Sequence, residues 1–216
     1  MSVNPLENLI VLTLLQTISK SGSYYSNIVG FIDGTIRPIC RPKYKQREVY
    51  SGYKKQHVVK YQSVVFLNGI IGRLDGPYIG RRHDAVILKL SNISEEFSKF
   101  FVNSDGTWFA VYGDPGYSNQ KFIKTGFRAK NNENENELQF NRVMSSLRVS
   151  VEYGFGKILQ LFAFVDLKKN QKLLLSPLKK YYLIAAIFTN IHSCLRGNQI
   201  SDFFNCPTPE LEMYLS

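Results

Sequence analysis

An Asn-Gly pair at residues 68–69 is the feature that most restricts the fold of this 216-residue chain. It separates two apolar, strand-like runs, VVKYQSVVFL at 58–67 and IIGRLDGPYI at 70–79. Asn-Gly between two such runs is typical of a tight hairpin turn, because both residues tolerate a positive φ angle. The sequence therefore predicts an antiparallel pair of strands over residues 58–79.

The spacing of apolar residues predicts the remaining elements. NIVGFID (27–33) is almost wholly apolar, as in a buried central strand, and WFAVYGD (108–114) is the next such strand. Helical spacing is found at 5–20, 84–101, 137–163 and 177–195. The polar stretch NNENENE (131–137) is typical of a loop tip or of the lead-in to a helix.

This order of elements indicates an α/β (mixed α+β) fold, with one central sheet flanked by helices. We expect an N-terminal helix and linker at 1–26, a main domain at 27–195 and a C-terminal tail at 196–216 with little periodicity. No apolar run reaches the roughly 18 residues that a membrane-spanning helix needs, so no membrane partner is expected. Three scattered cysteines argue for a reducing, intracellular setting.

Three carboxylates stand out by position. Asp33 and Asp114 each follow an apolar strand, and Glu152 lies inside the long helix between apolar neighbours. If the two strands are neighbours, their ends bring the aspartates together, and crowded carboxylates need a compensating cation such as Mg²⁺ or Mn²⁺. Taken singly, each residue has a plainer explanation: the aspartates as turn residues, and Glu152 as the i, i+4 salt-bridge partner of Arg148.

His83 and Asp84 introduce the helix predicted at 84–101. Asp84 occupies the place of an N-cap or of a first-turn carboxylate, with His83 on the surface. The alternative is that Asp84 contributes to a metal site. Capping is the simpler interpretation of the sequence.

A basic stretch covers residues 37–60 of a chain whose formal net charge is +10. Such a stretch is often only a solvated face, but three interleaved tyrosines, at 44, 50 and 53, favour contact with nucleic acid. The residues expected to bind nucleic acid are Arg37, Arg41, Lys43, Lys45, Arg47, Lys54, Lys55, Lys60, Arg81 and Arg82, with Arg128 and Lys130 extending the field.

Several motifs together resemble the endonuclease domain of Harbinger-type transposases, in the DDE superfamily, and of the nucleases derived from them. They are FIDGT (31–35) with the basic stretch, GPYIGRRHDAVIL (76–88), GDPGY (113–117) and FNRVMSSLRVSVEYGFGKI (140–158). The resemblance runs from about residue 27 to 195. It implies a ribonuclease H-like fold, in which a mixed five-stranded sheet lies between helices.

The resemblance also implies a site. Asp33, Asp114 and Glu152 would be the catalytic and metal-binding residues. His83 and Asp84 would form the histidine-aspartate motif, with Asp84 a possible metal ligand or, in place of Asp114, the second catalytic aspartate. Arg148 would orient Glu152 or contact a phosphate. The implied reaction is cleavage or transfer of DNA strands with two Mg²⁺ or Mn²⁺ ions, and the implied location is the nucleus.

Members of this family usually carry a longer N-terminal region with a DNA-binding part, whereas 26 residues precede the first predicted strand here. We therefore expect residues 1–26 to be a remnant, with target recognition lost or supplied by a partner protein. Two alternatives stay open. The chain could be a decayed or domesticated module that binds DNA or protein, or a ribonuclease H-like enzyme that acts on RNA.

Overall fold

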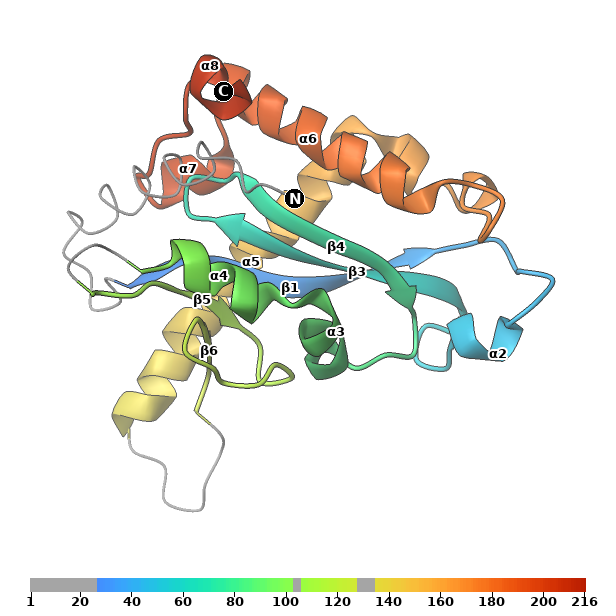
Figure 1. Cartoon of the computed structure of the whole chain (residues 1–216), viewed down its shortest axis with the longest axis horizontal. Helices are drawn as coiled ribbons and strands as arrows, with labels where there is room; N and C mark the ends of the chain where they lie inside the picture. Colours follow the sequence, from blue (N-terminus) through green and yellow to red (C-terminus); the bar gives the residue numbers. More distant parts are fainter. Residues whose placement is uncertain (1–26, 103–105, 128–134) are drawn as a thin grey trace.

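The computed structural model describes residues 27–102, 106–127 and 135–216. The helix predicted at 5–20, most of the polar stretch at 131–137, and Arg128 and Lys130 lie outside these ranges. A mixed, six-stranded sheet forms the centre of the described part, which confirms the α/β (mixed α+β) class (Figure 1). Its strands are β1 (Ile28–Pro38), β2 (Tyr50–Ser51), β3 (Gln56–Phe66), β4 (Ile71–Ile79), β5 (Ala110–Gly113) and β6 (Ile123–Thr125).

The predicted hairpin is confirmed as β3 and β4, which pair antiparallel. Gly69 has a φ angle of 77°, and its N–H donates to the Phe66 carbonyl at 2.9 Å. On its other side, β3 pairs antiparallel with β1. β1 pairs in parallel with β5, and β5 in parallel with β6. The two apolar strands that precede the aspartates are therefore neighbours, as their composition indicated.

β1 is longer than predicted and corrects the position of Asp33. The strand continues to Pro38 because its second half pairs with β3, where Pro38 lies opposite Val58. Asp33 lies opposite Ser63, within the strand and not at its end. The pairing with β3 thus overrides the tendency of Asp-Gly to form a turn.

The helices are α2 (Gln46–Val49), α3 (Asp84–Ser91), α4 (Ile93–Phe100), α5 (Glu135–Leu161), α6 (Leu178–Arg196), α7 (Gln199–Phe203) and α8 (Leu211–Leu215). Two short 3-10 helices, Ala163–Val165 and Lys168–Asn170, lie between α5 and α6. α5 and α6 confirm the two long helices predicted from periodicity. None of the helices in the described ranges is both long and apolar enough to cross a membrane.

Two helix predictions are corrected. The segment predicted as one helix at 84–101 is two, because Asn92 adopts a left-handed conformation (φ 52°) between α3 and α4. The tail at 196–216, predicted to have little periodicity, forms the two short helices α7 and α8. The Asn198 side chain accepts a hydrogen bond from Ile200 N at the start of α7 and donates to the Gly69 carbonyl at 3.0 Å. This contact ties the tail to the hairpin turn.

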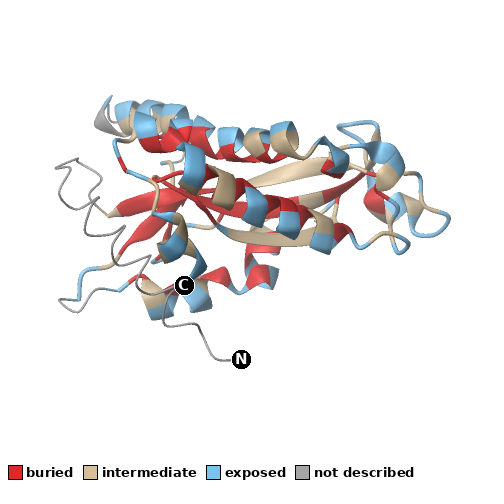
Figure 2. Cartoon of the chain, turned by 90° about the horizontal axis from the view of Figure 1, so that it is seen from above, coloured by how far each residue is buried: buried red, intermediate tan, exposed pale blue. Residues whose placement is uncertain are grey.

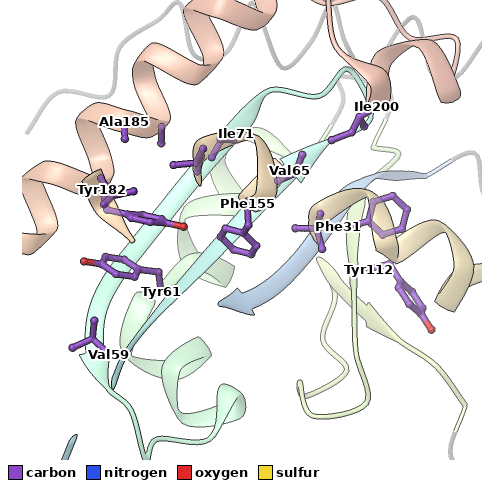
Figure 3. Close-up of a cluster of buried hydrophobic side chains, with 14 of the residues drawn as sticks. Phe31, Val59, Tyr61, Val65, Ile71, Tyr112, Phe155, Tyr182, Ala185 and Ile200 are labelled. Atoms are coloured by element: carbon purple, nitrogen blue, oxygen red, sulfur yellow. The ribbon is translucent and has the colours of Figure 1, made fainter. Parts of the chain in front are cut away.

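Each face of the sheet carries its own apolar cluster. α5 and α6 cover one face, where Phe31, Tyr61, Val65, Phe155 and Tyr182 gather (Figure 3). Tyr61 and Tyr182 stack with ring centroids 4.3 Å apart. The other face packs against α3 and α4. Figure 2 shows that the helices bury one side against the sheet and expose the other.

Gly154 explains how α5 approaches the sheet so closely. A Cβ atom at this position would lie 3.0 Å from the Val65 side chain of β3. A glycine in the middle of a helix costs about 1 kcal/mol relative to alanine, and the close packing on β3 offsets that cost. From the sequence alone, Gly154 only lowers the helix propensity of the segment. In the fold, its missing side chain lets α5 pack closely on β3.

The Asn190 side chain of α6 binds the backbone of strand β4. Its Oδ1 accepts from Ile71 N at 2.9 Å, and its Nδ2 donates to the Ile71 carbonyl at 2.9 Å. Asn190 is 3% exposed, so both bonds are shielded from water. The side chain therefore takes the place of a further strand at this point of β4.

Candidate active site

Asp33, in the middle of β1, and Asp114, directly after β5, lie side by side on two neighbouring parallel strands. Phe31 of β1 is paired with Tyr112 of β5, and each aspartate comes two residues later along its own strand. Neighbouring strands lie about 4.8 Å apart, so this register places the two aspartates next to each other. The parallel pairing of β1 with β5 therefore brings together two residues that are far apart in the sequence.

Local hydrogen bonds fix both carboxylates. Asp33 Oδ1 accepts from Gly34 N at 2.7 Å, and its side chain is 17% exposed. Asp114 directly follows β5, and its Oδ1 accepts from Gly116 N at 3.0 Å. Asp114 is thus a turn residue, as its simpler explanation proposed, and it is also held beside Asp33. The two explanations do not exclude each other.

Arg148 of α5 binds Asp33 and not Glu152. Its guanidinium donates to Asp33 Oδ2 at 2.5 Å. Within the described ranges it forms no ion pair with Glu152, one helical turn further on, whose side chain is exposed. The i, i+4 salt bridge is therefore wrong, and so is the orientation of Glu152 by Arg148. The guanidinium connects α5 to β1 instead.

The pKa of Asp33 shows that the three carboxylates act on one another. Burial raises this pKa from 3.8 to about 6, against the opposing effects of Arg148 and the Gly34 N–H. The negative charges of Asp114 and Glu152 raise it further. Asp114 and Glu152 therefore lie near enough to Asp33 for their charges to act on it, because charges in a partly buried site are only weakly screened.

Asp84 is a fourth carboxylate beside β1. It is the first residue of α3, while exposed His83 occupies the N-cap position without a side-chain cap bond. The Asp84 Oδ1 atom pairs with Lys60 Nζ at 3.2 Å and lies 3.1 Å from where a Gly34 Cβ would be. Of the two positions predicted for Asp84, the first-turn carboxylate is confirmed and the N-cap is wrong. The Asp84 carboxylate lies beside Gly34, the residue after Asp33.

Tyr117, the last residue of GDPGY, completes the group. It is 3% exposed, and its hydroxyl has no hydrogen-bond partner among the described residues. Burial raises the pKa of this phenol, and the charges of Asp84, Asp33 and Asp114 raise it further. Sequence analysis missed Tyr117, although its place three residues after Asp114 was the available signal.

Comparison with known families places this site in context. The family model described as DDE superfamily endonuclease matches residues 32–190, a range that includes all the carboxylates above. The chain belongs to the DDE superfamily endonuclease family. No curated protein and no solved structure matches the chain. The mixed sheet flanked by helices is consistent with the ribonuclease H-like fold of DDE endonucleases.

The donor chemistry of this DDE endonuclease site suits a hard divalent cation. Asp33, Asp114, Glu152 and Asp84 offer carboxylate oxygens, which Mg²⁺ and Mn²⁺ prefer. In the arrangement described, no three His, Cys, Asp or Glu side chains of the described residues lie close enough to share one ion. The Arg148 guanidinium instead supplies the positive charge at Asp33. The four carboxylates therefore have the chemistry to bind a divalent cation. In the arrangement described, the Arg148 guanidinium lies beside one of them.

The basic residues of this DDE endonuclease fall into two groups. Arg37 and Lys60 are engaged inside the fold: Arg37 contacts Tyr182 Oη at 3.1 Å and Asp166 at 3.4 Å, and Lys60 pairs with Asp84. These contacts leave both side chains little surface for DNA. Arg82 is partly exposed. The exposed group consists of Arg41, Lys43, Lys45, Arg47, Lys54, Lys55 and Arg81.

Replacing Tyr117 by phenylalanine is expected to leave the fold at least as stable, because the lost hydroxyl has no partner among the described residues. The matched control is Tyr61→Phe, which removes a buried hydroxyl that donates to the Leu178 carbonyl at 3.1 Å. The control should lower the free energy of unfolding by about 1 kcal/mol. Urea denaturation of both variants measures the difference, and an equal loss in both would contradict the assignment.

Proposed function

We propose that this DDE endonuclease is of the Harbinger type and cleaves DNA phosphodiester bonds with the help of divalent metal ions. The proposal rests on the electrostatic coupling of Asp33 with Asp114 and Glu152. The negative charges of Asp114 and Glu152 raise the pKa of Asp33, so Asp33 lies in a negative field that a bound cation would offset. The GPYIGRRHDAVIL and GDPGY motifs support the Harbinger assignment.

Asp33, Asp114 and Glu152 would hold the metal, and Asp84 is a further candidate ligand. When bound, Mg²⁺ or Mn²⁺ would lower the pKa of the attacking water and stabilise the leaving oxygen. Arg148 balances the charge of Asp33, and its planar guanidinium has further N–H groups that suit a phosphate oxygen. The Tyr117 hydroxyl is one more donor close to these carboxylates.

A DNA-binding module that keeps the fold without the activity is the second candidate. The ion pair between Arg148 and Asp33 favours it, because Arg148 satisfies one oxygen of Asp33 without a metal. The neighbouring carboxylates of Asp33 and Asp114 favour the endonuclease, because binding DNA alone gives no reason to gather negative charge. We therefore rank the enzyme first.

The remaining features of the proposal concern the setting of the reaction. We propose a DNA substrate and a nuclear location, with target recognition supplied by a separate DNA-binding protein. The exposed basic residues on and around α2 and β3 support a polyanionic partner. A parallel assay with RNA of the same sequence distinguishes the enzyme from a ribonuclease H-like enzyme that acts on RNA.

A nicking assay on supercoiled plasmid tests the proposal. The purified chain is expected to nick DNA with Mg²⁺ or Mn²⁺ and to lose the activity when the metal is chelated. Asp114→Asn should reduce the nicking rate on the order of 100-fold, because asparagine has nearly the same shape as aspartate but lacks the charged oxygen ligand.

The matched control is Asp202→Asn, which makes the same chemical change at an exposed position of α7. It should nick at the rate of the unaltered chain. Equal nicking by the unaltered chain and Asp114→Asn, or no nicking by either across a range of metal concentrations, would leave the binding module as the function.

A further inference from the structure

A pocket of about 620 Å³ is lined by residues in and around α2 and β2, together with His57 and Arg81, and none of the four carboxylates described above lines it. Arginines from three separate segments line it: Arg41 before α2, Arg47 in α2 and Arg81 between β4 and α3. Tyr50 of β2 and His57 of β3 also line it, with ring centroids 5.4 Å apart. We refer to these five residues as the arginine pocket. In Figure 1, α2 marks its position.

The arginine pocket has positive charge that nothing nearby neutralises. No carboxylate lines it, and within the described ranges none of its three arginines forms an ion pair. Arg41 donates to the Gln46 side chain at 2.9 Å, which fixes its direction without cancelling its charge. Burial lowers the pKa of His57, and the charges of Arg41 and Lys168 lower it further. The local field therefore favours an anion.

The side chains that line the arginine pocket favour a phosphodiester over other anions. Each guanidinium presents a planar set of N–H donors that matches two phosphate oxygens. The Tyr50 and His57 rings offer apolar faces and polar tips, which suit the sugar next to a phosphate. A nucleic-acid backbone presents both kinds of group side by side.

The backbone sets an upper limit on the distance between Asp33 and the part of the arginine pocket next to His57. The His57 carbonyl accepts from Ile39 N at 3.0 Å, and Ile39 lies six residues after Asp33 along an extended chain. Six residues at roughly 3.3 Å each span at most about 20 Å. A DNA duplex rises about 3.4 Å per base pair, so the same length corresponds to about six base pairs.

We propose that the arginine pocket binds a backbone phosphate of the DNA duplex, about six base pairs from the phosphodiester that is cut. This inference rests on the proposed endonuclease function. β1 then carries a cleavage residue in its middle and reaches the phosphate contact just beyond its end. The DNA lies along the strand, with its flank held by Arg41, Arg47 and Arg81.

Binding of duplexes of graded length tests this proposal. The Arg47→Ala/Arg81→Ala variant removes two exposed arginines that line the pocket from separate segments of the chain. It is prepared with Asp33→Asn, so that binding is measured without cleavage. Fluorescence anisotropy compares a hairpin duplex with a stem of 4 base pairs, too short to span both points, with a duplex of 24 base pairs. We expect about a 10-fold loss of affinity on the longer duplex and less than a 2-fold loss on the shorter one. The slope of log affinity against log salt should fall by about one on the longer duplex.

The matched control is Lys179→Ala/Lys180→Ala, which removes the same charge from the exposed start of α6. It should change affinity equally at both lengths, because it alters only the overall charge. A loss in the arginine variant that is equal at both lengths, or absent, would overturn the proposal. Failure of the endonuclease function gives a different result: the length-dependent loss persists, while the unaltered chain nicks no plasmid.

Discussion

Replacing Asp33 by asparagine is expected to abolish DNA cleavage and to stabilise the fold. Asp33 is the carboxylate on which both Asp114 and Glu152 act, so its loss should disturb the whole metal site. We expect the nicking rate to fall about 1,000-fold or more, a larger effect than at Asp114. Because asparagine keeps the Oδ1 acceptor for the Gly34 N–H, the backbone of β1 should stay in place.

The gain in stability follows from the pKa of Asp33. Burial raises this pKa from 3.8 to about 6, so the folded chain holds the proton more tightly than the unfolded chain does. The free energy of unfolding must then fall as the pH rises from about 4 to about 6, and stay level above that. A shift of this size corresponds to about 2–3 kcal/mol. Asparagine carries no charge, so the variant should be about 2 kcal/mol more stable than the unaltered chain at pH 7.

Urea denaturation at pH 4.5 and pH 7 measures both effects. The unaltered chain should be less stable at pH 7 than Asp33→Asn, with a smaller difference at pH 4.5. Asp202→Asn is the control, because the same change at an exposed site should leave the pH dependence as it is. A variant that is less stable than the unaltered chain at pH 7 would contradict the prediction. It would mean that the ion pair with Arg148 outweighs the burial of Asp33.

Replacing Asn190 by alanine is expected to lower the free energy of unfolding by about 3 kcal/mol. The change leaves the N–H and the carbonyl of Ile71 without partners in a buried place, and each such group costs about 1–3 kcal/mol. The Asn190 bond to Tyr214 Oη, 3.0 Å long, is lost as well. For a chain of this size the melting temperature should fall by about 6–12 °C, as measured by differential scanning calorimetry.

Asn141 offers a closely matched control. Its side chain makes the same pair of bonds, accepting from Phe127 N and donating to the Phe127 carbonyl, both at 2.9 Å. These bonds are exposed, so water can replace them, and Asn141→Ala should cost less than about 1 kcal/mol. Similar losses in the two variants would show that burial does not decide the strength of these contacts.

Local patterns predicted the parts of the fold that depend on neighbours in the sequence. The hairpin at Asn68-Gly69 and the helices α5 and α6 follow from turn chemistry and apolar spacing. The length of β1 and the break at Asn92 did not follow. β1 extends to Pro38 because β3 pairs with it, and Asn92 interrupts a pattern whose apolar spacing runs on. Both depend on contacts that the segment itself does not contain.

The site divides in the same way. An aspartate at the end of an apolar strand is visible in the sequence, and the parallel register of β1 with β5 confirms that Asp33 and Asp114 are neighbours. The partners of charged residues were not visible. Arg148 has both Asp33 and Glu152 within conceivable reach, and only the packing of α5 on β1 selects Asp33. Arg37 looked like part of the basic surface until its contacts with α6 placed it inside the fold.

The parallel pairing of β1 with β5 also has a consequence for how the protein folds. The hairpin of β3 and β4 can form early, because its strands are adjacent in the sequence. β1 and β5 meet only after the whole segment between them, with α3 and α4, has closed into a long loop, which is entropically costly. Glu152 is synthesised later still. The nascent chain therefore has no complete set of carboxylates, and the site comes into being only with the finished sheet.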